Sequence, residues 1–122
     1  MGKKYIIEIA TTDYSSAKAA VAGGADRIEL CMALGEGGLT PSMGLIKQCL
    51  ADFNVALFPI IRPRSGDFLY SDTDFKIMKR DALLCKELGC DGLVVGFLHR
   101  LLNSRTIIIL LKKKMYLSLN LI

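Results

Sequence analysis

Residues 24–30 read Gly24-Ala25-Asp26-Arg27-Ile28-Glu29-Leu30, and residues 89–95 repeat that pattern as Gly89-Cys90-Asp91-Gly92-Leu93-Val94-Val95. Each copy holds a glycine typical of a helix end, an aspartate in a turn, and then an apolar run typical of a buried strand. A repeat of this kind favours a (β/α) barrel over a sandwich. It does not by itself distinguish the barrel from a doubly wound sheet.

The chain around these two segments alternates strand-like and helix-like stretches. We expect strands over 5–10, 27–31, 55–61 and 93–95, and helices over 14–23, 43–53 and 71–88. The last helix has the strongest start, because Ser71 is followed three residues later by Asp74. The strands are almost continuously apolar, as in a parallel sheet that is covered on both faces. The pattern therefore predicts an α/β fold.

The length and charge of the chain limit the functions that it could have. The chain has 122 residues, of which 52% are hydrophobic, so it is one domain or part of one. Residues 1–98 hold 11 Lys and Arg against 12 Asp and Glu, a net charge of −1, whereas residues 99–122 hold 5 basic residues and no acidic one. The basic character belongs to the tail, and we expect no nucleic-acid partner.

The cysteines and the apolar runs indicate the compartment. The longest apolar run of the tail is Ile107–Leu111, far below the roughly 20 residues that a membrane helix needs. The start of the chain does not resemble a secretory signal, and the four cysteines form no CxxC pair. We therefore expect reduced thiols, a cytoplasmic location and no membrane partner.

Sites of parallel α/β sheets lie beyond the carboxyl ends of the strands. The second expected strand ends on Glu29 and Cys31, and the third is followed by Arg62, Arg64 and Asp67. One interpretation is an enzyme-like site in which the two arginines hold a small anionic metabolite. The other is a buried ion pair between Glu29 and Arg62 that closes this end of the fold.

Cys31 is the only cysteine at the carboxyl end of an expected strand. Thiolate and thioether sulfur both suit soft Cu(I), so Cys31 with Met43 is a candidate copper site. The alternative is that Cys31 is a small buried hydrophobic residue. His99, the single histidine, is expected to be exposed to solvent rather than to act as a base or a ligand.

Four segments resemble the CutC family. They are GGADRIELC at residues 23–31, EGGLTPS at 36–42, IRPRSGDFLYS at 61–71 and LGCDGLVVG at 88–96, and the resemblance covers about residues 5–98. It implies a TIM-barrel-like fold, a cytoplasmic location, and a role in copper homeostasis with Cu(I) as the bound ion.

The resemblance also implies site residues. The family binds Cu(I) through cysteines at the ends of the first two strands, and Cys31 matches the second of them. Ala10 stands at the first position, and Thr12 stands where the family has an aspartate. Glu29, Arg62 and Asp67 match the polar residues at the mouth of the barrel.

The tail departs from the family pattern. We expect residues 1–98 to form the first four βα units of a truncated TIM (β/α) barrel, and residues 99–122 to be a divergent basic and apolar tail. Such a tail is typical of a splice variant or a frameshift, so a truncated, non-functional isoform is a further hypothesis. The tail could contain a strand over 107–111 or a helix over 106–119.

A sheet of four strands would have an open edge and an uncovered inner face. We expect that face to expose Val55, Leu57, Ile60, Val94 and Val95. A second copy of the chain or the full-length protein is the partner expected to cover it.

Overall fold

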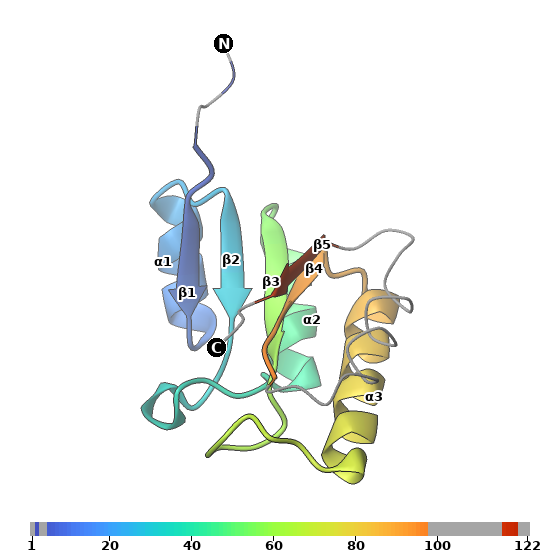
Figure 1. Ribbon diagram of the computed structural model, residues 1–122. Coiled ribbons are helices and arrows are strands. Elements are labelled where there is room, and N and C mark those ends of the chain that lie inside the picture. The colour runs from blue at the N-terminus through green and yellow to red at the C-terminus, as the bar shows by residue number, and fades with distance from the viewer. Residues whose placement is uncertain (1, 3–4, 98–115, 120–122) are drawn as a thin grey trace.

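The structure is a computed structural model that describes residues 2, 5–97 and 116–119. Its centre is a parallel sheet of β1 (Glu8–Thr11), β2 (Arg27–Leu30), β3 (Ala56–Ile61), β4 (Gly92–Val95) and β5 (Tyr116–Leu119). The helices α1 (Tyr14–Ala22), α2 (Met43–Asp52) and α3 (Asp72–Leu88) cover one face of this sheet (Figure 1). A short 3₁₀ turn, Leu34–Glu36, lies between β2 and α2.

The strand order separates the two folds that the sequence pattern left open. A doubly wound sheet reverses its strand order at a switch point and carries helices on both faces. Here the order is β1-β2-β3-β4-β5, so each strand pairs with its neighbours in sequence. With α1, α2 and α3 on one side, the described part of the chain forms part of a (β/α) barrel, and the predicted α/β fold is confirmed.

The helix ends follow the local signals in the sequence. The side chain of Ser71 accepts a hydrogen bond from the Asp74 amide, and the Asp74 side chain accepts one from the Ser71 amide. α3 ends at Gly89, whose φ of 91° lies in the left-handed region that favours glycine. The predicted span of 71–88 is therefore confirmed to within the capping residue.

The first strand begins later than predicted. β1 covers Glu8–Thr11 rather than 5–10, because its partner β2 begins at Arg27, which pairs with Glu8. Residues before Glu8 have no strand beside them, and Figure 1 shows this segment leaving the sheet. The amide of Ile7 donates instead to a carboxylate oxygen of Asp26 at 2.8 Å.

The core lies between the sheet and the helices. Leu57 and Val95 are 1% and 0% exposed and belong to this core, and Val55 packs against it. The expectation that these three residues line an uncovered inner face is therefore wrong. Side chains alternate along a strand, so Ile60 lies on the face opposite to Leu57 and Ile61. The strands are apolar on both faces, which hid this alternation.

The tail adds a strand that the sequence did not predict. β5 pairs in parallel with β4, from Gly92↔Tyr116 to Val95↔Leu119, so β4 is not the edge of the sheet. The predicted helix over 106–119 is wrong for these four residues, and the predicted strand over 107–111 lies outside the described residues. Pairing with a second copy or with the full-length protein stays a prediction.

No helix in the described part of the chain is both long enough and apolar enough to cross a membrane.

Loss of the α3 cap should destabilise the fold. Ser71→Ala removes the oxygen that accepts the Asp74 amide, and we expect the free energy of unfolding to fall by about 1 kcal/mol. Urea unfolding followed by circular dichroism measures this change. Ser65→Ala is the matched control, because Ser65 is exposed and caps no helix. An equal loss in both variants would contradict a role for the cap.

Candidate functional site

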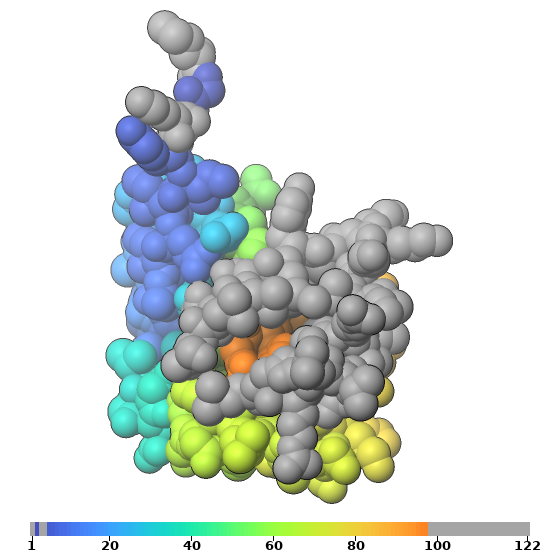
Figure 2. Space-filling view, viewed as in Figure 1, coloured from blue at the N-terminus to red at the C-terminus, as the bar shows by residue number. Residues whose placement is uncertain are grey.

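The candidate site is a hollow of about 220 Å³ at the carboxyl ends of β2, β3 and β4. Two loops border this end of the sheet, residues 31–42 after β2 and residues 62–71 after β3. Figure 2 shows them side by side along one edge of the molecule. The residues that line the hollow are Glu29, Gly37, Ile60, Ile61, Arg62, Phe68, Val94 and Gly96.

Arg62 joins the two loops. Its guanidinium donates to the carbonyl oxygens of Glu36 and Gly38 in the first loop and of Gly66 in the second, the last two at 3.0 Å. It also lies over the ring of Phe68, with 4.9 Å between the guanidinium carbon and the ring centroid. Only 7% of Arg62 is exposed, so these bonds are made in a largely dry environment where they are strong.

The loop glycines make room for Arg62. A Cβ atom on Gly37 would lie 2.9 Å from the Nη1 atom of Arg62, and the φ of Gly37 is +86°. Both the close approach and the left-handed backbone require glycine at this position. The backbone of Glu36-Gly37-Gly38 therefore forms the binding surface for the Arg62 guanidinium.

No ion pair joins Glu29 to Arg62 in the described part of the chain, although both line the hollow. The guanidinium already donates to backbone carbonyls, which are closer acceptors. The hypothesis of a closing ion pair therefore has no support in this geometry.

Two buried polar atoms lack a partner. The Nε atom of Arg62 and the hydroxyl of Tyr70 have no hydrogen-bond partner among the described residues. Burial raises the pKa of Tyr70, whereas the positive charges of Arg62 and Arg64 and a side-chain interaction with Arg62 lower it, so the two groups lie close to each other. Unpaired buried polar groups are rare in native proteins, which makes this corner a candidate for contact with a bound group.

Arg64 and Asp67 have a different role from Arg62. Arg64 pairs with Asp67 and Asp74, at 3.1 Å and 3.2 Å, and donates to the Leu69 carbonyl at 2.9 Å. Neither Arg64 nor Asp67 is among the residues that line the hollow. The structure therefore brings Glu29 and Arg62 together at the hollow and places Arg64 and Asp67 in the fold of the adjoining loop.

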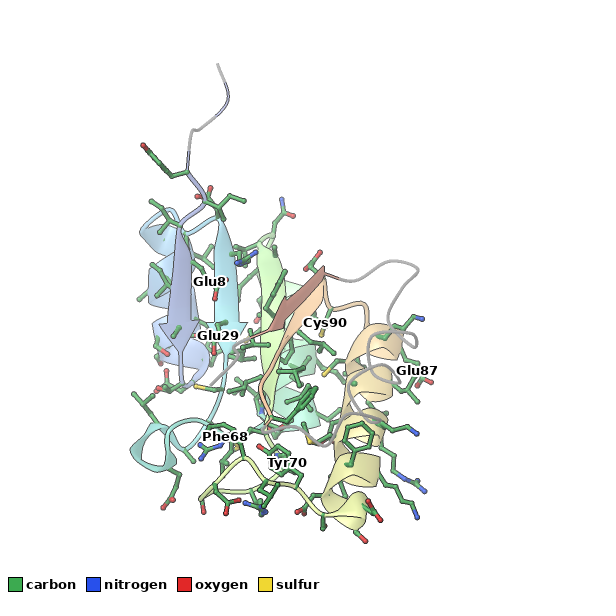
Figure 3. The ribbon with its side chains drawn as sticks, in the orientation of Figure 1. Glu8, Glu29, Phe68, Tyr70, Glu87 and Cys90 are labelled. Atoms are coloured by element: carbon green, nitrogen blue, oxygen red, sulfur yellow. The ribbon has the colours of Figure 1, made fainter. Side chains whose placement is uncertain are left out.

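A charged cluster on the inner face of β1 and β2 was not predicted. Glu8 pairs with Arg27, whose guanidinium carbon lies 4.5 Å from the ring centroid of Phe58. Figure 3 shows Glu8 and Glu29 on these neighbouring strands. Burial raises the pKa of Glu29, and the charge and hydrogen bond of Glu8 raise it further, while Arg27 opposes the rise. The alternation of Arg27 and Glu29 along one strand was the sequence feature from which this cluster could have been predicted.

Cys31 is buried at the same end of the sheet, 4% exposed, and its Sγ donates to the Thr11 carbonyl at 3.5 Å. Burial raises the pKa of this thiol, and the charge of Glu29 adds to the rise. A Cβ atom on Gly38 would lie 3.4 Å from this Sγ, so the thiol is packed against the glycine loop.

The donors around Cys31 fit Cu(I) only in part. The other three cysteines lie in or beside the helices, and Met43 lines a separate hollow beside Cys85, so the predicted pairing of Cys31 with Met43 is not seen at the mouth. Among the described residues, no group of three or more His, Cys, Asp or Glu side chains could hold a metal ion. His99 lies outside those residues. Cys31 thus supplies one soft donor.

Comparison with known proteins decides the family. The sequence model of the CutC family matches residues 5–109. This range includes both loops and all of the residues that line the hollow. The chain belongs to the CutC family. The resemblance seen in the four sequence segments is confirmed, and the match extends past residue 98, where we expected the CutC-like part to end.

Relatives within the CutC family are close in sequence. A human protein named copper homeostasis protein cutC homolog is 49% identical over 94 residues, which is 77% of this chain and 34% of the human protein. A family protein CutC from Chromobacterium violaceum is 50% identical over 93 residues, 76% of this chain and 38% of that protein. The chain spans about a third of the length of these curated relatives.

A solved CutC structure has the same fold. The crystal structure of a CutC protein from Streptococcus agalactiae superposes with a TM-score of 0.79 at 32% identity. The superposition covers 93% of this chain and 58% of that one. This likeness agrees with the strand order in assigning the partial (β/α) barrel.

The burial of Glu29, with Glu8 beside it, should make stability depend on pH. A carboxyl group whose pKa is raised by folding binds protons more tightly in the folded chain, so stability falls as the pH rises from the unfolded value of 4.5 toward the raised value. Glu29→Gln removes this titration. We expect its free energy of unfolding to lack that fall, as measured by urea unfolding from pH 4 to pH 8. Parallel profiles for the wild type and the variant would contradict the assignment.

Proposed function

We propose that the protein acts in copper homeostasis and that Cu(I) binds through the thiolate of Cys31. The human and mouse relatives carry copper homeostasis in their names, at 49% and 47% identity. The observation that supports the proposal most directly is the position of Cys31 at the carboxyl end of β2, where sites of this fold lie.

Binding of Cu(I) to Cys31 exchanges the thiol proton for the metal ion. Cu(I) is soft and prefers thiolate sulfur, so binding requires Cys31 to release its proton to solvent and to give up its bond to the Thr11 carbonyl. The raised pKa opposes this release. A single thiolate of this kind suits exchange of the ion with a second thiol better than storage. We also propose a cytoplasmic location, because all four cysteines are free.

Removal of the Cys31 thiol should remove copper from the mouth. Cys31→Ser replaces a soft donor with a hard one, and we expect the chain to lose one equivalent of Cu(I) in an anaerobic titration against a chromophoric Cu(I) chelator. Cys49→Ser is the matched control, because Cys49 is another buried thiol but lies on α2. If both variants keep the wild-type stoichiometry, Cys31 is not a ligand.

A second candidate function is the binding of a small anion in the hollow. It is favoured by the Nε atom of Arg62, a residue that lines the hollow, because this atom is buried without a partner among the described residues. An anion bound there would accept from the Arg62 Nε–H group, and the half-buried Glu29 carboxyl lines the same hollow. An enzyme that acts on a small anionic metabolite would need a binding group of this kind.

Inorganic phosphate is a suitable first probe of this hollow. Binding to the folded state alone should raise the midpoint of thermal unfolding, by about 4–8 °C for each kcal/mol of stabilisation. We expect Arg62→Met to abolish the rise. Arg64→Gln removes the same charge as Arg62→Met from a side chain outside the hollow, and it should keep the rise. Equal rises in the wild type and both variants would show a general salt effect and reject the site.

A further inference from the structure

Two buried thiols lie in contact at the end of α3, away from the mouth. Cys85 and Cys90 are 2% and 5% exposed, and Figure 3 shows Cys90 beside β4. The turn that joins them is held by a bond from the Cys90 amide to the Cys85 carbonyl at 3.0 Å, with Gly89 in the left-handed region. The thiol of Cys90 hydrogen-bonds to Cys85, which lowers the pKa of Cys85 and raises that of Cys90.

One of these thiols also faces a hollow between α2 and α3. This hollow, of about 100 Å³, is lined by Thr40, Pro41, Met43, Ile46, Asp81, Leu84, Cys85 and Leu88. Met43 brings a thioether to it and is 45% exposed. Cys85 is therefore the link between the surface hollow and the buried thiol pair.

We propose that Cys85 and Cys90 bind one Cu(I) ion between their sulfur atoms, with the hollow between α2 and α3 as the route by which the ion arrives. Two thiolates are a sufficient donor set for a soft monovalent ion, and the Met43 thioether at the hollow is a further soft donor along the route. This site uses neither Cys31 nor the hollow at the mouth.

The charge balance of this site follows from its residues. Each Cu–S bond forms as a thiol releases its proton to solvent, and no electron is transferred. The half-buried Asp81 carboxyl lies one helical turn before Cys85 and lines the hollow, where its negative charge attracts a cation. The bound ion then replaces the proton that the two sulfur atoms otherwise share.

Cys49 provides the contrast. It is equally buried, at 1% exposed, and belongs to the same core as Cys85 and Cys90, but it lies on α2 and lines neither hollow. The proposal therefore depends on the pairing of two thiols beside an accessible hollow, and not on buried cysteine as such.

The test is anaerobic Cu(I) titration of the full chain against a chromophoric Cu(I) chelator. We expect Cys85→Ala and Cys90→Ala each to weaken one equivalent of Cu(I) by more than the roughly 10–100-fold that loss of an outer-shell partner costs, because each removes a direct ligand. Cys49→Ala is expected to leave that equivalent unchanged. A Cys85→Ala variant that keeps the wild-type affinity and stoichiometry would overturn the proposal.

A second measurement does not depend on the folding of those variants. X-ray absorption at the copper edge of the Cys31→Ser variant should show a copper ion with two sulfur neighbours. A copper ion surrounded mainly by oxygen or nitrogen, or no bound copper, would overturn the proposal.

If only Cys31→Ser loses copper, the mouth binds the ion and the Cys85–Cys90 site is wrong. If only Cys85→Ala and Cys90→Ala lose it, the reverse holds.

Discussion

The hydrogen bonds of the Arg62 guanidinium to loop carbonyls are the constraint on which the candidate site depends. They tie the loop after β2 to the loop after β3, and the backbone of Arg62 is tied to Thr40 as well, with the Arg62 amide donating to the Thr40 Oγ1 atom at 2.8 Å. An arginine occupied in this way is first a structural residue. Its Nε atom, which has no partner among the described residues, is what remains for a ligand.

The sequence predicted those parts of the fold that short-range chemistry determines. The cap at Ser71 and the stop at Gly89 involve neighbouring residues, so α3 was placed correctly. The start of β1 depends instead on where β2 begins, and the phase of Leu57 and Val95 depends on which face the helices cover. Neither can be read from a run that is apolar on both faces.

The candidate sites show the same division. Glu29 and Arg62 could be placed at one end of the sheet because parallel strands bring their carboxyl ends together. Glu8 was missed because its contact with Glu29 arises from the register of two strands. The Cys85–Cys90 pair was missed because the five-residue spacing matches no known motif, and only the left-handed turn at Gly89 brings the thiols together.

The backbone contacts of Arg62 with residues 36–38 also limit which residues of this site can change during evolution. The bond to Arg62 uses only the backbone carbonyl of Glu36, so many side chains would serve at this position without loss of the bond. Gly37 has no such freedom, because any side chain would displace the guanidinium. New ligand preferences would therefore have to arise from residues that border the hollow without supporting Arg62, such as Ile60 and Val94, while the loop itself stays fixed.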